Sequence, residues 1–463
     1  CLSSGRAKSG KITMNLAKLL AARAEAGNPV RVGLIGAGKF GSMFLAQARL
    51  TAGMHLLGIA DLNVEQAAKN CRQAGWPAEQ IAAASLDDAG KSGATNIGDD
   101  AMALIAHPEL EVLIDATGDP RVGIRHCLAA IEHGKHVIMV NVEADVVAGP
   151  LLARRAEQAG VVYSLAWGDQ PALIAEHVDW ARTCGFKVVC AGKGTRYLPS
   201  YHGLTPDSVP DVLAQYLEVD PGAINIKMFN SFLDGTKSGI EMTAVCNATG
   251  LTPQDEGLGF PPATRFELAA VCKPATSGGC LSRDGTTEVV SSLYRDGSGV
   301  TNHLAMGTYV VIEGETEYAR QCFREYHMLA DSSGQFAALY RPTHMIGLEL
   351  GVSVASVALR GEPTGAPIGF RSDVVAVAKR ALKKGEMLDG EGGFMVWGKQ
   401  VPAPKSLAMG GLPLGLAGGV PLTRDIAEGE LLRWDDAAID PADTAVIIRR
   451  EMEAAFGRAN AER

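Results

Sequence analysis

The sequence predicts an α/β protein in three parts: an N-terminal doubly wound parallel sheet, an α+β middle part and a small β-rich C-terminal part. Short apolar strands alternate with helical segments up to about residue 165, as such a sheet requires. The pattern of apolar and polar residues changes after Trp167 and again after a glycine- and proline-rich linker at 361–367. A chain of 463 residues also exceeds the size of one hydrophobic core. We place the domains at 1–168, 169–360 and 361–463.

The first strand of the chain runs into three spaced glycines and then a helical segment. Gly36 would permit a tight turn, Gly38 the close approach of a pyrophosphate, and Gly41 the packing of the helix on the strand. The next strand ends in Asp61, at the distance expected for an acid that binds ribose. The pattern predicts a Rossmann dinucleotide site, and the alternative is a glycine turn of structural use only. Cofactor contacts are expected from Gly36, Gly38, Lys39, Phe40, Gly41 and Asp61.

A second set of cofactor contacts is expected where later strands end. The strand at 111–115 leads to Thr117, Gly118, Asp119 and Pro120, and the strand at 136–140 leads to Asn141 and Glu143. Ligands bind at the carboxyl ends of parallel strands, so these residues should flank the cofactor, unless they form plain strand-to-helix turns. We expect helices over 64–74, 122–133 and 150–159, an enlarged loop over 85–98 and a strand over 161–165.

The middle part carries most of the candidate substrate residues. A strand from residue 187 is expected to lead into a cationic glycine turn with Lys193, Arg196 and Tyr197, which suits an anion. A polar run follows between apolar segments, and its composition is that of a phosphate or polyol site. The run contains Lys227, Asn230, Ser231, Asp234 and Thr236.

A helix is expected to begin near Thr236, which places Lys237 and Glu241 one turn apart on one face. This spacing suits a charge pair in a cleft. The alternative is an exposed salt bridge that contributes little to stability. The polar run beside the pair favours the cleft.

Further along, strands over 288–293 and 309–312 are expected to belong to a second sheet. Arg341 and His344 share a turn with a proline and are further site candidates, whereas His303 and His327 are expected to be structural. The last hundred residues contain a partly repeated Lys-Gly-Glu turn pattern. We expect them to form a β-rich module that is structural or closes a cleft.

Composition narrows the class of protein. The net charge of −9 argues against a nucleic-acid surface, although a local basic pocket could still bind a small anion. The nine cysteines form no Cys-x-x-Cys pair, which indicates reduced thiols in a cytoplasm. The longest uncharged apolar run, at 407–422, is broken by glycines and prolines, so no membrane span is expected.

The leading segment carries Lys8, Lys11, Lys18 and Arg23 among leucines. It could mimic a targeting helix, but we favour a helix that packs on the next domain or on a partner subunit.

Catalytic motifs for several other reactions are absent from the sequence. There is no HExxH, GxSxG or Walker A loop, which disfavours zinc hydrolysis, serine hydrolysis and P-loop phosphoryl transfer. Hydride transfer to a carbonyl remains, in which the protein positions the cofactor and stabilises the developing alkoxide.

Six motifs together resemble one known family. They lie at 36–41, 116–120, 168–171, 234–237, 341–344 and 384–390. The chain resembles, from about Pro29 onward, the deoxyxylulose-5-phosphate reductoisomerase-like (DRL) proteins, which are homoserine-dehydrogenase-like Rossmann oxidoreductases with a C-terminal SAF domain. The resemblance implies a homodimeric, NADPH-dependent enzyme of isoprenoid precursor synthesis. It would convert 1-deoxy-D-xylulose 5-phosphate to 2-C-methyl-D-erythritol 4-phosphate.

The resemblance also suggests roles for individual residues. Lys237 and Glu241 would polarise the carbonyl and move protons, with Lys193 as a third catalytic residue. Charge-assisted donors would hold the phosphate and hydroxyls. The expected substrate-binding residues are Arg196, Tyr197, Lys227, Asn230, Ser231, Asp234, Arg341 and His344.

Two features depart from this picture. Asp61 predicts NAD(H), because an acid there repels a 2′-phosphate, whereas the resemblance implies NADP(H). We follow the resemblance, with Arg72 as a distant candidate partner of that phosphate. The compact acidic cluster with which ordinary reductoisomerases bind Mg²⁺ or Mn²⁺ has no clear counterpart. Asp234 and Glu241 are candidate oxygen ligands if a divalent metal binds.

Two alternatives stay open at this point. A homoserine-type dehydrogenase would use Lys237 for carbonyl reduction without rearranging the carbon skeleton. A catalytically silent dinucleotide-binding regulator would use the C-terminal module as a partner surface.

Overall fold

The computed structural model describes residues 15–216 and 224–461, and the side chains of these as far as residue 457. Lys8 and Lys11 of the basic leading segment lie outside these residues. Within them the segment forms α1 (Leu16–Glu25), which the Asn15 side chain caps and which packs on α14 (Gly351–Arg360). Among the described residues, no helix has the length and apolar character needed to cross a membrane.

The N-terminal part is built on a six-stranded parallel sheet whose order is β3-β2-β1-β4-β5-β6. This is the strand order of the Rossmann fold, which confirms the predicted fold class. Its strands are nearly continuous buried runs, as expected where both faces are covered. They are β1 (Val30–Ile35), β2 (Met54–Ala60), β3 (Asn96–Gly98), β4 (Val112–Asp115), β5 (His136–Met139) and β6 (Tyr163–Leu165).

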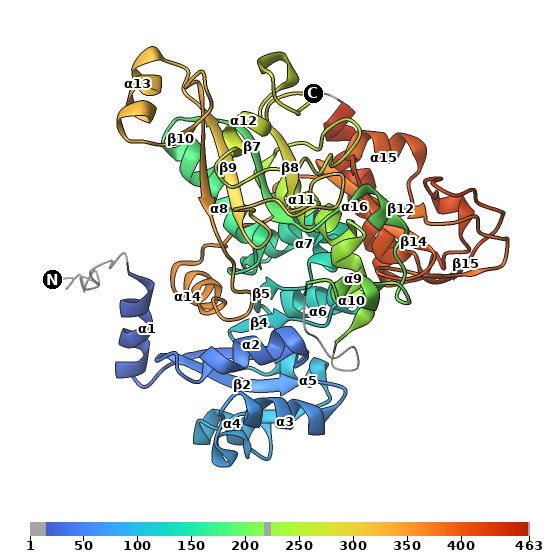
Figure 1. The fold of residues 1–463 in the computed structure, drawn as a ribbon. Helices are drawn as coiled ribbons and strands as arrows, with labels where there is room; N and C mark the ends of the chain where they lie inside the picture. The colour runs from blue at the N-terminus through green and yellow to red at the C-terminus, as the bar shows by residue number, and fades with distance from the viewer. Residues whose placement is uncertain (1–14, 217–223, 462–463) are drawn as a thin grey trace.

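Helices cover both faces of this sheet. The connecting helices are α2 (Lys39–Ala48), α3 (Val64–Gln73), α4 (Leu86–Ser92), α5 (Ala101–Ala106), α6 (Pro120–Glu132) and α7 (Val142–Gln158). One helix from much later in the chain, α14, joins them, because Leu350, Val354 and Val357 belong to the same apolar core as Val32 and Ile114. Figure 1 shows α14 beside this sheet, between it and the second one.

Two local predictions in this part were wrong. Residues 85–98 are not a loop: Ser85 caps α4 by accepting a hydrogen bond from the Asp88 amide, and β3 then pairs with β2. The helix expected at 150 begins at Val142, where Asn141 caps it. Pro150 lies inside this helix, where the burial of nearly every residue from Val142 to Leu152 outweighs the lost backbone hydrogen bond.

The middle part is built on a mixed five-stranded sheet in the order β10-β11-β9-β7-β8. Apolar side chains of α8 and α11 cover one face, and those of α12 cover the other. The strands are β7 (Lys187–Thr195), β8 (Thr286–Ser291), β9 (Thr308–Glu313), β10 (Leu329–Ala330) and β11 (Phe336–Arg341). The helices are α8 (Gln170–Thr183), α9 (Val209–Leu213), α10 (Ile226–Leu233), α11 (Thr236–Thr249), α12 (Leu268–Val271) and α13 (Glu317–Glu325).

The cationic glycine turn expected around Lys193 is part of strand β7 instead. Its glycines serve close contact with neighbouring chain. A Cβ on Gly192 would lie 1.8 Å from the Glu288 carbonyl oxygen, and one on Gly194 would lie 1.9 Å from that of Leu304. Glycine occurs both in turns and in strands that another backbone approaches closely. The glycines alone therefore did not show which of these two structures forms here.

The C-terminal part contains two small antiparallel pairs, β12 with β14 and β13 with β15. Its apolar side chains share one core with α6 and α7 of the first part and with Ile240 of α11. Figure 1 shows its strands and α16 side by side with α6, α7 and α11. The elements are β12 (Ser372–Ala378), β13 (Met387–Asp389), β14 (Val396–Pro402), α15 (Ala403–Met409), β15 (Gly418–Pro421) and α16 (Thr444–Ala461).

A buried ion pair fixes α16 on this core. The Arg449 guanidinium donates to both carboxylate oxygens of Asp373, at 3.1 and 2.6 Å, and to Glu453. Both Arg449 and Asp373 are almost fully buried. Removing one partner of such a pair leaves an uncompensated buried charge.

Arg449→Met is therefore expected to lower the free energy of unfolding by about 3–5 kcal/mol, measured by urea titration at pH 7. The matched control is Arg324→Met, because Arg324 pairs with Glu317 at the surface and such pairs contribute about 0–1 kcal/mol. Equal losses in the two variants would contradict the assigned role of Arg449.

Candidate active site

The glycine loop after β1 has the geometry of a dinucleotide-binding loop. Gly36 has φ +92°, and a Cβ there would lie 2.6 Å from the Ala116 carbonyl oxygen, so only glycine fits. A Cβ on Gly41 would lie 2.5 Å from the Gly36 carbonyl oxygen, whereas one on Gly38 would meet nothing within 4 Å. The open side at Gly38 and the first amides of α2 together form a cradle that fits a pyrophosphate.

Asp61 lies beside this loop at the end of β2. One carboxylate oxygen accepts a hydrogen bond from the Ala37 amide at 2.7 Å, and the other accepts one from the Asn63 amide at 2.8 Å. The carboxylate therefore faces the loop, as an acid that binds ribose should.

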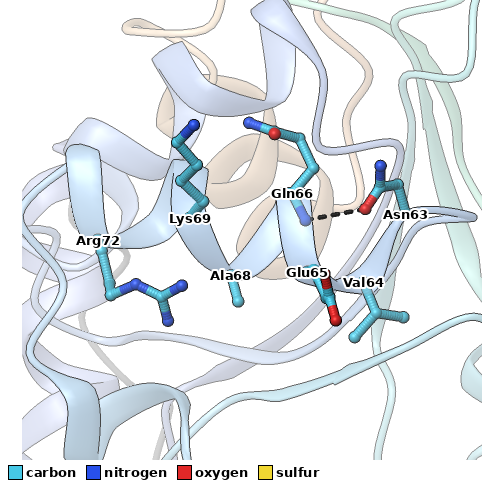
Figure 2. Close-up of a pocket in the computed structure, with 7 residues that line it drawn as sticks. All are labelled: Asn63, Val64, Glu65, Gln66, Ala68, Lys69 and Arg72. Carbon is cyan, nitrogen blue, oxygen red and sulfur yellow. Dashed lines mark hydrogen bonds between the residues drawn. The ribbon is translucent and has the colours of Figure 1, made fainter.

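Arg72 is far from that position. Figure 2 shows Asn63 and Arg72 at opposite ends of α3. The rise of an α-helix over this length separates them by about 13 Å along the axis. The depression drawn there is lined by α3 and its cap alone, without any residue of the glycine loop, and we assign it no role.

Hydrogen bonds fix the residues at the ends of β4 and β5. The Asn141 side-chain amide donates to the Thr117 hydroxyl and to the Asp119 carbonyl, at 3.1 and 2.8 Å. Asp119 in turn caps α6, with Pro120 in its first turn. The structure thus brings Thr117, Gly118, Asp119 and Pro120 to the carboxyl edge of the sheet.

Two buried ion pairs lie at this edge: one joins the middle part to the Rossmann part, and the other joins two elements of the middle part. Lys237 of α11 pairs with Glu143 of α7, and Lys193 of β7 pairs with Glu241 of α11. The predicted pairing of Lys237 with Glu241 was wrong, because each finds a partner on another element. Burial alone would lower the pKa of Lys237, but nearby carboxylates outweigh it and raise that pKa above its ordinary value. These carboxylates belong to Glu143, Glu391, Glu241 and Asp169.

Asp169 is a site residue that the sequence reasoning missed. Its carboxylate caps α8 by accepting a hydrogen bond from the Gln170 amide. Burial and the Glu241 carboxylate raise the pKa of Asp169 to about 6, although Lys237 and His344 act in the opposite direction. The motif at 168–171 contained this residue, but an acid before a helix is usually only a cap.

Glu391 is the second missed residue, and the C-terminal part supplies it. It lies on the loop between β13 and β14, and the Ser231 hydroxyl donates to its carboxylate. Burial and the Glu143 carboxylate raise the pKa of Glu391 to about 7, against the opposing effects of Lys237 and Ser231. Nothing in the local sequence distinguished this glutamate from the others of that region.

Several predicted substrate residues contact this loop or Lys379 beside it. The Asn230 side chain donates to the carbonyls of Gly392 and Gly393, and Lys227 donates to the Asp389 carbonyl at 3.3 Å. Asp234 is buried and pairs at 2.8 Å with Lys379, while burial raises its pKa.

The remaining predicted residues have other partners. Tyr197 is buried, stacks on Phe260 and shares a hydrogen bond with His202. Arg341 pairs with Glu349, and His344 contacts the Met306 carbonyl at 2.8 Å. Arg196 stacks on Tyr216, and its buried Nε has no hydrogen-bond partner among the described residues.

A cleft of about 370 Å³ lies between the Rossmann edge and the C-terminal part. Its walls include both cofactor-side residues and the carboxylate from the late loop. The lining residues are Gly118, Asp119, Pro120, Arg121, Glu143, Ile240, Gly390, Glu391, Leu414, Gly415, Gly418 and Gly419.

The residues present do not fit a divalent metal. Asp234 and Glu241, the candidate oxygen ligands, are each paired with a buried lysine. Across residues 15–216 and 224–461, no group of three or more His, Cys, Asp or Glu side chains could hold an ion.

Comparison with known proteins agrees with this geometry. Residues 168–350 match the family described as oxidoreductase DRL, catalytic domain, and residues 30–141 match the oxidoreductase family with an NAD-binding Rossmann fold. Two successive segments of the chain are thus similar to an NAD-binding oxidoreductase domain and to a DRL catalytic domain. Both matches are to oxidoreductase domains, and the SAF character of the C-terminal part stays a prediction.

Individual relatives are more distant. A homoserine dehydrogenase of Pseudomonas aeruginosa is 28% identical over 203 residues, which cover 42% of this chain and 44% of that protein. The chain thus matches less than half the length of this relative. Among solved structures, a homoserine dehydrogenase of Thiobacillus denitrificans is 14% identical with a TM-score of 0.40, covering 72% of this chain and 73% of its own. Biliverdin reductase of Synechocystis, solved with biliverdin and NADP⁺, is 20% identical with a TM-score of 0.26, covering 37% and 48%.

Asp61→Asn is expected to shift the ratio of the dissociation constants for NADH and NADPH toward NADPH by about tenfold or more. The variant removes the charge that repels a 2′-phosphate and keeps one acceptor oxygen for the loop amides. Fluorescence titration with both dinucleotides measures the ratio, with Glu132→Gln on the exposed end of α6 as the control. An unchanged ratio would show that the carboxylate does not face the ribose.

Proposed function

We propose that the protein is a reductoisomerase that uses NADP(H) to convert 1-deoxy-D-xylulose 5-phosphate to 2-C-methyl-D-erythritol 4-phosphate. The observation that carries the proposal is the pair of buried lysine–carboxylate contacts at the carboxyl edge of the Rossmann sheet. The match of residues 168–350 to the DRL catalytic domain supports this choice of substrate class.

The first requirement of this chemistry is a fixed positive charge for the carbonyl oxygen. Lys237 supplies it, because the surrounding carboxylates keep its ammonium protonated and Glu143 holds it toward the Rossmann edge. A bound nicotinamide would supply the hydride from that same edge. The glycine loop from Gly36 to Gly41 and the residues after β4 would bind the dinucleotide.

The second requirement is a base for the hydroxyl protons that move during rearrangement. Glu241 and Asp169 lie close enough to influence one another, and the pKa of Asp169 lies at about 6. A carboxylate near neutral pKa exchanges protons readily at working pH. Lys193 holds Glu241 in place from β7.

The third requirement is a cation for the phosphate. Arg196 directly follows the end of β7, the strand of Lys193, and carries a buried guanidinium nitrogen without a partner in the described residues. Buried donors normally have an acceptor, and a phosphate oxygen would provide one.

A second candidate is a homoserine-type dehydrogenase, which the relative from Pseudomonas aeruginosa favours. In that case Lys237 would stabilise the alkoxide of aspartate semialdehyde during simple reduction, and no carbon–carbon bond would change.

The deciding experiment is mass and NMR analysis of the product formed from 1-deoxy-D-xylulose 5-phosphate and NADPH. The expected product is the branched polyol phosphate, because rearrangement precedes reduction. A linear reduced sugar phosphate, or turnover of aspartate semialdehyde alone, would contradict the proposal.

The matched variants are Lys237→Met and Lys187→Met. Loss of the buried ammonium at Lys237 is expected to lower kcat by about 10²–10⁴-fold. Lys187 is half-exposed and pairs with Asp284 and Glu313 far from the cleft, so its variant should retain wild-type turnover.

A further inference from the structure

The loop at 389–393 is held in place by contacts from the middle part and from its own C-terminal part. Asn230 binds two of its carbonyls, and Lys379 donates to the Gly393 carbonyl at 2.9 Å. Gly392 has φ +65°, and a Cβ there would lie 1.9 Å from the Lys227 carbonyl oxygen. Asp389 accepts hydrogen bonds from the amides of Phe394 and Met395, which closes the loop on itself. The loop is therefore a fixed element, and it presents Glu391.

The Glu391 carboxyl lines the cleft together with Glu143 and the residues after β4. One of its oxygens accepts a hydrogen bond from Ser231, and no contact with another described residue engages the second oxygen. A half-buried carboxyl with one oxygen directed by a hydroxyl and one open is arranged to exchange a proton with a ligand in that cleft.

The charges around it come from every element that meets there. Glu143 of α7 raises the pKa of Glu391, Lys237 of α11 lowers it, and Asp234 raises it again. Other charged groups face the same loop or cleft. They are Asp119 and Arg121 at the start of α6, Lys227 of α10 and Lys379 after β12, while Glu241 of α11 acts on the neighbouring Lys237.

We infer that Glu391 is the proton donor of the carbonyl reduction, delivered to the active site by the C-terminal part of the chain. The inference rests on the proposed function. As the substrate carbonyl is reduced, its oxygen gains negative charge beside Lys237. The O–H bond of the Glu391 carboxyl breaks, the O–H bond of the product alcohol forms, and the carboxylate takes a new proton from water. Lys237 stabilises the charge and Glu391 supplies the proton, so the two roles fall on different residues.

The pH dependence follows from the pKa of Glu391, which lies at about 7. Only the protonated carboxyl donates, so the rate of reduction is fully present at lower pH and is lost as pH rises through about 7. The Ser231 hydrogen bond favours the charged form, so removing it raises the pKa and moves this loss to higher pH.

The test is the pH profile of kcat and kcat/KM for the wild type, Glu391→Gln and Ser231→Ala. Glu391→Gln is expected to lower kcat by about 10²–10⁴-fold and to abolish the alkaline loss. Ser231→Ala is expected to keep that loss at a higher pH. Glu428→Gln, an exposed glutamate of the same part, is the control with a wild-type profile. Unchanged kcat and an unchanged profile in Glu391→Gln, with dinucleotide binding intact, overturn the inference.

The profile is measured with whichever of deoxyxylulose phosphate and aspartate semialdehyde the wild type reduces, so a different substrate does not affect the test. A wild type that reduces neither overturns the proposed function by itself. Infrared difference titration of wild type against Glu391→Gln then decides for Glu391. A protonated-carboxyl band that is present in the wild type only and disappears near pH 7 supports the inference. If the wild type shows no such band at pH 5, the inference is overturned.

Discussion

Charge balance in the buried site is the constraint on which the arrangement of the whole chain depends. Four carboxylates, from Glu143, Asp169, Glu241 and Glu391, surround the two ammonium groups of Lys193 and Lys237. Buried charges are costly unless they are paired, and two lysines pair with only two acids. The other two, Asp169 and Glu391, have raised pKa values near neutrality. The same imbalance provides groups that exchange protons at working pH.

No single part of the chain contains this site. Glu143 belongs to the Rossmann part, Lys193 and Lys237 to the middle part, and Glu391 to the C-terminal part. The apolar core that runs from α6 and α7 through Ile240 into β12 and α16 holds these three parts in register. Arg121 of α6 adds hydrogen bonds to the C-terminal part, because its guanidinium donates to the carbonyls of Leu416 and Gly418.

The sequence predicted the regions whose structure is determined locally. The glycine loop, the alternation of strand and helix and the second sheet were confirmed, because a tight turn and a buried parallel strand each impose their own residue pattern. Residues 85–98 were misassigned because a serine cap in a polar stretch looks like a loop until β3 pairs with β2. The helix predicted to begin at Pro150 begins at Val142 instead, because burial overrides the low helix propensity of proline.

The site was predictable only in part, for a related reason. Lys237 and Glu241 were identified from their spacing, but each forms its ion pair with a residue on another element. Asn230, Ser231 and Asp234 were identified as polar and clustered, yet all three contact the C-terminal part. Asn230 and Ser231 bind a loop about 160 residues later, and Asp234 pairs with Lys379. Glu391 could not be found at all, since its importance comes from tertiary contacts that no local pattern encodes.

The central claim is that Lys237 is coupled to Glu143 across the boundary between the parts, and not to Glu241 on its own helix. Double-mutant cycles on the free energy of unfolding test this directly, with Lys237→Met combined with Glu143→Gln or with Glu241→Gln. The expected coupling is about 1.5–3 kcal/mol for Lys237 with Glu143 and clearly smaller for Lys237 with Glu241. A larger coupling energy for Lys237 with Glu241 than for Lys237 with Glu143 would favour the ion pair within the helix and would contradict this claim.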